Sequence, residues 1–382
     1  MSEEIQCYPS FDQMDLKETI LRGIYGYGFE KPSVIQSKAI VPIIKGGDII
    51  AQAQSGTGKT ATFSIGVLQQ IDESIPNCQA LIMAPTRELS NQIHRVITSI
   101  SDYMNITCHI SIGGKSIGED VKALRNSCHI IVGTPGRIYD LLERGILQSE
   151  HIKSVVLDEA DEMLSIGFKE QIRLIFECMP SSCQIILFSA TMKQEMITLT
   201  ETFLRSPTRI FVKRDEITLE GIKQYYVNVE REDWKITTLF DLYEQININQ
   251  AIIFCNTRKT VEWLSEQMNE KGFCVLPFHS ELDQYQREDV MRKFRLGTAR
   301  VLISTDILGR GIDVQQVSMV FNYDLPVKID NYIHRIGRSG RFGRKGVAIN
   351  FITNDSISIM QEIQNYYSTQ INELPIDIAS IE

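Results

Sequence analysis

Eight consecutive residues in the first quarter of the chain have the composition of a phosphate-binding loop. They are Ala53, Gln54, Ser55, Gly56, Thr57, Gly58, Lys59 and Thr60. The glycines let backbone N–H groups turn toward a phosphate, and a helix that follows would add its positive end. Lys59 suits contact with the β- and γ-phosphates, and Thr60 suits a Mg²⁺ ligand. The general pattern has Gly where this chain has Ala53, and the alternative is a glycine-rich turn that only caps a helix.

A group of acidic residues supplies the partner that such a loop needs. Residues 158–161 are Asp-Glu-Ala-Asp and directly follow an apolar run at residues 154–157. At the end of a strand, Asp158 suits a Mg²⁺ ligand, and Glu159 suits the residue that orients and deprotonates an attacking water. Acidic residues are also common in the first turn of a solvated helix. The preceding run and the upstream loop favour the catalytic interpretation.

Short apolar runs must position these residues. In the first half they cover residues 48–51, 80–84, 130–132, 154–157, 185–188 and 209–212, and in the second half 225–229, 251–254, 275–278, 300–303, 319–321 and 347–352. Near-continuous runs of Val, Ile and Leu are typical of strands covered on both faces, and their alternation with helical segments indicates parallel sheets. The predicted fold class is α/β, with two doubly wound parallel-sheet domains. Polar, glycine-rich clusters follow many of the runs, at the sheet edge where such folds bind ligands.

Length and composition fit this organisation. We place the first domain at residues 1–213, a charged linker at 214–222 and the second domain at 223–382. The net charge of −9 excludes a surface that is basic all over, so a nucleic acid would need a local basic groove. Eight cysteines without a C-x-x-C pair indicate reduced thiols. No apolar run reaches membrane-spanning length, so we expect a soluble intracellular protein.

The acidic tetrapeptide and the loop resemble motifs of the DEAD-box helicases. The order of further motifs resembles that family from near residue 11 to near residue 380, and is most similar to the eukaryotic translation initiation factor 4A group. The resemblance implies two RecA-like domains that use ATP and Mg²⁺. Residues 9–37 resemble the family's Q motif, in which Gln36 would bond the edge of adenine and Phe11 would stack on the base. The alternative for Phe11 is a hydrophobe anchored at the surface.

The resemblance also implies roles for residues after several other strands. Ser189 and Thr191 would couple hydrolysis to strand separation through bonds to the acidic motif, and Asp313 would contact the ATP ribose. RNA contacts are implied for Pro85, Thr86, Arg87, Gly114, Thr134, Gly136, Arg137, Asn256, Arg258, Arg287, Thr305 and Asp306. Thr134 as N-cap with Pro135 after it would point the N–H groups of a helix outward, which suits a phosphate. Ordinary loop turns are the alternative for any one of these segments.

An arginine-rich segment near the end of the second half resembles the family's last motif. Arg338 and Arg341 are three residues apart and would share a face if that segment is helical. Their planar guanidinium groups suit stabilisation of the γ-phosphate in the transition state, and His334 would contact the acidic motif. The alternative is a basic helix end or a contact with the RNA backbone.

Together these likenesses imply an RNA-stimulated ATP hydrolase, an RNA helicase that unwinds RNA secondary structure locally. The group it most resembles acts on mRNA 5′ leaders in translation initiation. That implies single-stranded RNA and a scaffold protein as partners, a monomer, and a cytoplasmic location. The alternative is an ATP-gated RNA clamp, or a nuclear or nucleolar RNA-processing helicase like the exon-junction and ribosome-biogenesis relatives of the family.

Overall fold

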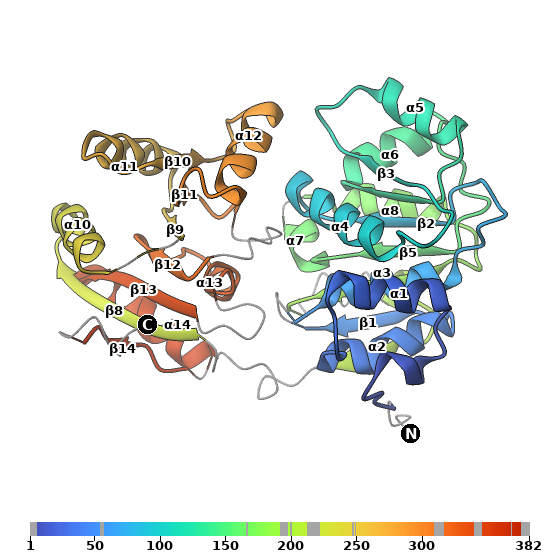
Figure 1. Cartoon of the computed structure of the whole chain (residues 1–382), viewed down its shortest axis with the longest axis horizontal. Coiled ribbons are helices and arrows are strands. Elements are labelled where there is room, and N and C mark those ends of the chain that lie inside the picture. The colour runs from blue at the N-terminus through green and yellow to red at the C-terminus, as the bar shows by residue number, and fades with distance from the viewer. Residues whose placement is uncertain are drawn as a thin grey trace. The chain divides into compact units, whose positions relative to one another are not determined.

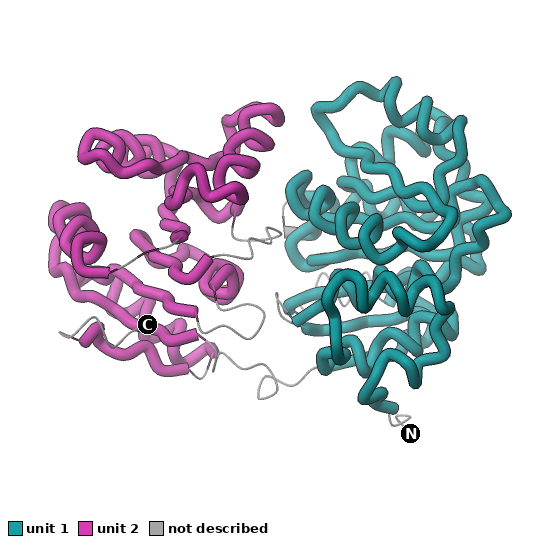
Figure 2. The backbone as a smooth tube through the Cα atoms, viewed as in Figure 1, with its two compact units in different colours: residues 1–217 teal, residues 218–382 magenta. Residues whose placement is uncertain are grey.

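The computed structural model divides the chain into two compact units, residues 1–217 and 218–382 (Figure 2). It describes residues 6–53, 57–165, 167–191, 198, 201–211, 222–246, 248, 250–308, 317–339, 346–367 and 369–375. Nearly all of the linker expected at residues 214–222 therefore lies outside the described residues. Its last residue, Ile222, begins strand β8 (Ile222–Glu230) because it pairs with Gly346, so the expected linker was one residue too long at this end.

The first unit is built on one seven-stranded parallel sheet in the order β3-β4-β2-β5-β6-β1-β7 (Figure 1). Its strands are β1 (Ile49–Gln52), β2 (Ala80–Met83), β3 (Cys108–Ser111), β4 (Ile130–Gly133), β5 (Ser154–Leu157), β6 (Gln184–Ser189) and β7 (Thr208–Phe211). The sequence did not predict β3. This edge strand pairs only with β4 and is half-buried along most of its length, so it lacks the Val and Ile run that marks the inner strands.

Helices cover both faces of this sheet. They are η1 (Phe11–Met14), α1 (Glu18–Tyr27), α2 (Val34–Ile44), α3 (Lys59–Gln70), α4 (Arg87–Ile100), α5 (Ile117–Arg125), α6 (Pro135–Glu143), α7 (Ala160–Ser165) and α8 (Lys169–Glu177). Neighbouring strand residues alternate between two cores: Ala80 and Ile82 of β2 belong to one, Leu81 and Met83 to the other. This alternation explains why the inner strands are apolar at every position.

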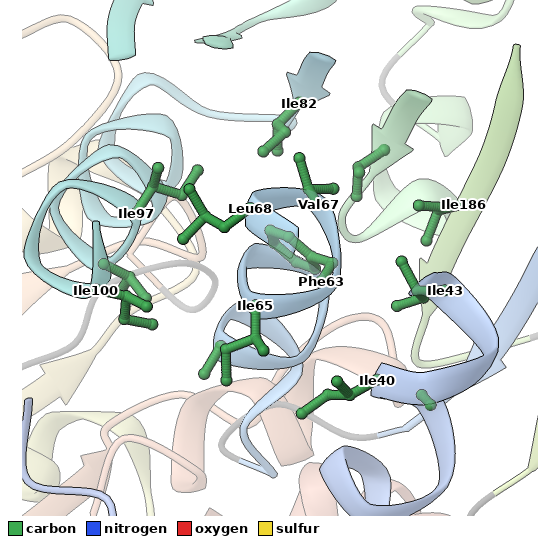
Figure 3. Packing of buried hydrophobic residues seen from close by; sticks show 14 of the residues in the cluster. Ile40, Ile43, Phe63, Ile65, Val67, Leu68, Ile82, Ile97, Ile100 and Ile186 are labelled. Carbon is green, nitrogen blue, oxygen red and sulfur yellow. The ribbon is translucent and has the colours of Figure 1, made fainter. Parts of the chain in front are cut away.

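Helix α3, which follows the phosphate-type loop, is held inside the first of these cores. Its side chains pack against α2, α4, β2 and β6 (Figure 3), and the residues in contact are Phe63, Ile65, Val67, Leu68, Ile40, Ile43, Ile97, Ile100, Ile82 and Ile186. Each of these side chains is fully buried. Because a close-packed interior resists displacement, the first turn of α3 is fixed relative to the ends of β1 and β6.

The second unit repeats the architecture. Its sheet has the order β10-β11-β9-β12-β13-β8-β14, which is the strand order of the first unit when both are numbered from their own first strand. The further strands are β9 (Ala251–Phe254), β10 (Val275–Phe278), β11 (Val301–Ser304), β12 (Met319–Asn322), β13 (Gly346–Thr353) and β14 (Asn372–Glu373). The helices are η4 (Glu232–Trp234), α10 (Lys235–Gln245), α11 (Arg258–Glu270), α12 (Gln284–Arg295), α13 (Asp330–Ile336), η5 (Asn354–Ser356) and α14 (Ile357–Tyr367). The prediction of two parallel-sheet α/β domains is confirmed.

The cysteines and the helices relate to two expectations from the sequence, reduced thiols and the absence of a membrane-spanning segment. All eight cysteines are free thiols, four of them buried. Among the described residues, no helix is both long enough and apolar enough to cross a membrane.

Candidate active site

The end of the phosphate-type loop joins α3 through a glycine that no other residue could replace without strain. Gly58, the N-cap of α3, has φ 95°. A Cβ at this position would lie 2.7 Å from Gln36 Nε2 and 3.2 Å from Ser33 Oγ. The left-handed backbone and the close approach both require glycine. Ala53 directly follows β1, Thr57 is half-buried, and Gln54, Ser55 and Gly56 lie outside the described residues.

Gln36 is placed against this loop by a capping box at the start of α2. The N–H of Ser33 donates to Gln36 Oε1 at 2.8 Å, while the Ser33 side chain accepts from the N–H of Gln36 at 3.4 Å. Ser33 Oγ also donates to the carbonyl of Thr57 at 2.8 Å, and Gln36 Nε2 donates to the carbonyl of Gly58 at 3.4 Å. The Q-motif residues and the phosphate loop therefore form one hydrogen-bonded assembly.

The ring of Phe11 is not accessible in the way that stacking on adenine would require. Its side chain has 0% exposed surface and packs edge-on against Tyr25, with ring centroids 6.5 Å apart. It belongs to the hydrophobic core that also holds α3. In this structure the ring is covered, unlike a surface-anchored hydrophobe, and its stacking on adenine stays a prediction.

Lys59 and Asp158 form the electrostatic centre of the site. The Lys59 side chain is buried, and its Nζ has no hydrogen-bond partner among the residues that the structure describes. Burial raises the pKa of the Asp158 carboxyl to about 7, although the Lys59 ammonium opposes the rise. A buried ammonium without an acceptor is costly. Such an arrangement fits a ligand with several negative charges, and half-buried Thr60 lies beside Lys59 in the first turn of α3.

Glu159 has the only backbone strain in the acidic motif. Its φ is 54°, a left-handed conformation that residues other than glycine rarely adopt. The side chain is buried, and Oε2 accepts no hydrogen bond within the described part of the chain. Strain of this kind is concentrated at functional sites. The combination fits a carboxylate held ready for a water molecule.

The acidic motif is bonded to the residues after β6, as the coupling prediction requires. Thr191 Oγ1 donates to Asp161 Oδ2 at 2.8 Å, and the N–H of Thr191 donates to the same oxygen at 3.2 Å. Ser189 Oγ donates to the carbonyl of Thr191 at 2.6 Å rather than to an acidic residue. Thr191 thus makes the direct bond, and Ser189 holds Thr191 in place.

Two of the predicted RNA-contacting segments of the first unit lie side by side. Thr86 is the N-cap of α4 and accepts a hydrogen bond from the N–H of Leu89 at 3.2 Å. Arg87 follows it, and a Cβ on Gly114 would lie 2.7 Å from Arg87 Nη1. Gly114 has φ 85°, a left-handed conformation that favours glycine, and a side chain there would displace the end of Arg87. Pro85 is buried at the end of this edge.

A third segment, the start of α6, joins the first two through Arg137. Thr134 is the N-cap, with Pro135 at the first helical position as predicted, although its side chain makes no capping bond. Arg137 Nη2 donates to the carbonyl of Lys115 at 2.7 Å, and Nη1 donates to Asp120 Oδ2 at 2.6 Å. Gly136 is half-buried beside it. The structure therefore brings the predicted RNA residues of the first unit together.

In the second unit, Arg335 connects two of the predicted RNA segments. Its fully buried guanidinium donates to Asn256 Oδ1 at 2.9 Å and to Asp306 Oδ1 at 2.5 Å. Asp306 Oδ2 accepts from Asn331 Nδ2 at 2.8 Å. Both carboxylate oxygens of Asp306 are thus bonded within the unit, and its contact with RNA stays a prediction. Thr305, directly before it, is half-buried.

The predicted RNA arginines of this unit already have partners. Arg258 forms ion pairs with Glu281 and, at 3.7 Å, with Glu262 Oε2. Arg287 Nη2 donates to the carbonyl of Ser280. These bonds fix the two guanidinium groups near the carboxyl end of β10. Phosphate binding by Arg258 would have to compete with the two carboxylates.

The last motif is helical only in part. Helix α13 ends at Ile336, and Gly337 is its C-cap, so Arg338 lies beyond the end of the helix. Arg338 is buried, and its Nε donates to the carbonyl of His334 at 3.0 Å. His334 is buried in the last turn of α13. Arg341 and Asp313 lie outside the described residues, and the predicted contacts of these four residues with ATP or the acidic motif stay predictions.

Comparison with known proteins shows which family this chain belongs to. The DEAD/DEAH box helicase domain matches residues 33–199, and the helicase conserved C-terminal domain matches residues 234–343. The chain is 60% identical over 372 residues to the ATP-dependent RNA helicase eIF4A of Chaetomium globosum, a match that covers 97% of this chain and 94% of that protein. It is 59% identical to the protein of the same name from Neurospora crassa, with the same coverage. The chain belongs to the DEAD-box family of ATP-dependent RNA helicases.

Solved structures of DEAD-box helicases share the fold over nearly the whole chain. The structure of S. cerevisiae Dbp5 bound to RNA and ADP BeF3 has a TM-score of 0.89 and is 36% identical, covering 98% of this chain and 97% of that one. Mss116p bound to single-stranded RNA and AMP-PNP has a TM-score of 0.85 at 28% identity, covering 95% and 78%. The RecA-like fold, the ATP-hydrolysing activity and RNA as a ligand are thus established for this DEAD-box helicase.

Two residues that organise the DEAD-box site were missed in the sequence. Asp120 resembles an ordinary acidic residue in the first turn of a helix, next to Glu119. Arg335 lies inside the arginine-rich motif, but catalytic roles were predicted for its neighbours His334 and Arg338 and no role for Arg335. Both are buried and make several hydrogen bonds from different elements. Only the fold brings those partners together, so no local pattern could have marked the two residues.

Proposed function

We propose that this chain uses ATP and Mg²⁺ to separate short RNA duplexes in mRNA 5′ leaders during translation initiation. The relatives named eIF4A, at 58–60% identity over 97% of the chain, support the biological role. The chemistry rests mainly on the buried Lys59 ammonium, which has no acceptor among the described residues. It lies close enough to buried Asp158 to oppose the rise in the pKa of that carboxyl that burial causes.

The residues of the site fit a magnesium-bound triphosphate. Thr60 and Asp158 would hold the ion, which neutralises phosphate charge when it is bound. Lys59 would donate to the β- and γ-phosphates, and Gly58 leaves room for Gln36 beside the loop. Glu159 would orient a water molecule and accept its proton. Thr191, bonded to Asp161, would transmit a change at the acidic motif to the end of β6.

RNA would bind mainly through sugar and phosphate. Helix N-termini at Thr86 and Thr134, with Arg87 and Arg137 beside them, offer donors to phosphate but no base-reading set. We therefore propose little sequence preference. Any effect of RNA on ATP affinity must be matched by an equal effect of ATP on RNA affinity. We further propose a cytoplasmic monomer that works with a scaffold protein of the initiation machinery.

The chemistry is tested by steady-state ATP hydrolysis of the full chain with oligouridine RNA, with oligothymidine DNA and with no nucleic acid. We expect RNA to stimulate turnover at least tenfold and DNA to have little effect, because RNA differs by its 2′-hydroxyl groups. Stimulation by neither nucleic acid would refute the proposal.

The biological role is tested in a cell-free translation extract depleted of the endogenous factor. Added protein should restore a reporter with a structured 5′ leader more than one with an unstructured leader. Equal restoration of both reporters would contradict a role in leader unwinding. A tagged chain that is retained in the nucleus and hydrolyses negligible ATP would favour the RNA clamp instead.

A further inference from the structure

We propose that Asp120 is a positioning residue for RNA binding, which orients Arg137 and the loop at residues 113–115 toward the phosphate backbone. The inference rests on RNA binding by the first unit and adds a residue that no motif marks. Asp120 lies in the first turn of α5, and its side chain is only 4% exposed. A buried carboxylate is costly unless several donors surround it.

Three donors from two other elements surround the Asp120 carboxylate. Oδ2 accepts from Arg137 Nη1 at 2.6 Å. Oδ1 accepts from Ser111 Oγ at 2.8 Å and lies 2.7 Å from His109 Nε2, which carries the hydrogen in this arrangement. Burial alone would raise the pKa of Asp120, but the bonds from His109, Arg137 and Ser111 outweigh it and hold the pKa below its usual value. The group is therefore a charged acceptor fixed from both sides.

Arg137 extends this network to the loop that precedes α5. Its Nη2 donates to the carbonyl of Lys115 at 2.7 Å. The same loop contains Gly114, whose backbone lies against the guanidinium of Arg87. Asp120 thus acts through Arg137 on all three segments predicted to contact RNA: the start of α4, the loop at residues 113–115 and the start of α6.

The geometry leaves Arg137 able to bind a phosphate while Asp120 holds it. Of its five N–H donors, one on Nη1 and one on Nη2 are bonded to protein acceptors in the described residues. The side chain is 12% exposed, so part of the planar group remains accessible. A guanidinium fixed in advance loses less freedom when it binds. Since Asp120 is buried and bonded on both oxygens, it orients the arginine rather than competing with RNA from a mobile side chain.

The competing interpretation is that Asp120 only stabilises the edge of the sheet. Its bonds to β3 would then matter for folding, and loss of the carboxylate would lower stability without changing RNA affinity in the folded fraction. The two interpretations predict different values for the RNA concentration that gives half-maximal ATPase activity. That quantity reports on folded, active molecules and does not depend on how many of them there are.

The experiment compares full-length wild type, Asp120→Asn and Asp140→Asn in ATPase titrations with oligouridine at saturating ATP. The Asn side chain has an NH₂ group in place of one carboxylate oxygen. That group cannot accept a hydrogen bond from the donor it faces, so at least one of the bonds that Asp120 accepts is lost. We expect the half-saturating RNA concentration to rise about tenfold for Asp120→Asn, the loss typical of a charge-assisted hydrogen bond, with little change in maximal turnover. Asp140→Asn removes an exposed ion pair with Arg144 on α6 and should change neither quantity.

A double-mutant test shows whether Asp120 acts through Arg137. Adding Asp120→Asn to Arg137→Ala should raise the half-saturating concentration no further, whereas independent effects would multiply. Multiplying effects, or an unchanged concentration for Asp120→Asn alone, would overturn the inference while RNA stimulation of the wild type leaves the proposed function intact. A wild type without RNA stimulation would overturn both.

Stability is controlled by the thermal midpoint of each variant. If Asp120→Asn does not fold, Ser111→Ala is used to test the inference instead. It removes the hydroxyl that donates to Asp120 and leaves Arg137 and the carboxylate in place. A rise of about threefold in half-saturating RNA would then support the inference, because the remaining bonds of Asp120 still hold Arg137 and only part of the effect of one hydrogen bond is expected. No change in Ser111→Ala would overturn it.

Discussion

Thr191 donates two hydrogen bonds to a single oxygen of Asp161, from its hydroxyl at 2.8 Å and from its backbone N–H at 3.2 Å. Thr191 lies two residues after the end of β6, and Asp161 is the last residue of the acidic motif. The hydroxyl of Ser189 fixes Thr191 by donating to its carbonyl at 2.6 Å. These bonds form a direct mechanical connection between the hydrolytic residues and the segment after β6.

Removing the hydroxyl from this connection should uncouple hydrolysis from unwinding. In Thr191→Val the shape of the side chain is kept, but Asp161 loses one of the two bonds from Thr191, which weakens the connection by about 1 kcal/mol. We expect RNA-stimulated ATP hydrolysis to fall less than threefold while duplex unwinding falls about fivefold. The measurement is base pairs separated per ATP hydrolysed.

The matched control is Thr98→Val on α4, whose hydroxyl donates to the carbonyl of His94 at 2.8 Å on the exposed side of the helix. It removes the same group from a threonine that has no contact with the acidic motif in the described structure. Equal losses of hydrolysis and unwinding in Thr191→Val would contradict a coupling role, as would the same ratio in both variants.

Glu159→Gln should stop hydrolysis but leave binding intact. The substitution keeps the size of the side chain and removes the carboxylate that would accept a proton from water. Glu159 Oε2 has no hydrogen-bond partner among the described residues, so its loss breaks no internal bond at that atom. We expect turnover to fall at least a hundredfold, within the range for general-base removal, with affinity for ATP and RNA within threefold of wild type. Turnover near the wild-type rate would refute the role.

The raised pKa of Asp158 predicts how the stability of the protein without nucleotide and Mg²⁺ depends on pH. Its folded pKa of about 7 lies above the ordinary value of 3.8, so the folded chain keeps a proton that the unfolded chain loses between these values. The free energy of unfolding should therefore fall as the pH rises from about 4 to about 7, by at most about 1.4 kcal/mol per pH unit from this group.

Asp158→Asn isolates this contribution, because all other titrating groups stay in place. The variant should come closest to wild type in denaturant unfolding below about pH 4, where Asp158 is protonated in both the folded and the unfolded chain. It should gain stability relative to wild type as the pH rises from about 4 to about 7, and the difference should stay constant above that. Parallel stability curves for the two proteins from pH 4 to pH 7 would show that Asp158 titrates normally.

The sequence predicted best those features that depend on local chemistry. The inner strands were identified because they are buried on both faces, and Thr134 with Pro135 marked the start of α6. As expected, Asp158 directly follows β5 and Lys59 begins α3, while their contacts with ATP and Mg²⁺ stay predictions. Edge strand β3 was missed because burial on one side leaves it Cys-His-Ile-Ser, which has no apolar run.

The sequence could not show contacts made by distant parts of the chain. The full burial of Phe11 depends on α1 and the core below it, which the spacing of the Q motif does not specify. The motif around Asp306 likewise does not show that the guanidinium of Arg335 and the amide of Asn331 donate to its oxygens. The order of the strands in the sheet decides which distant residues become hydrogen-bond partners. A sequence motif contains no information about those residues.

The ion pair between Arg258 and Glu281 predicts a variant that binds RNA more tightly. Glu281 is 65% exposed, so unlike buried Asp120 it competes with phosphate for an arginine instead of fixing it. Glu281→Gln should lower the half-saturating RNA concentration two- to threefold, since an exposed pair contributes at most about 1 kcal/mol. Glu177→Gln on α8 is the matched control, because it removes the same charge from an exposed pair with Arg173 in the first unit. An equal shift in both variants would mean that only net charge matters, and a weaker affinity in Glu281→Gln would mean that Glu281 orients Arg258.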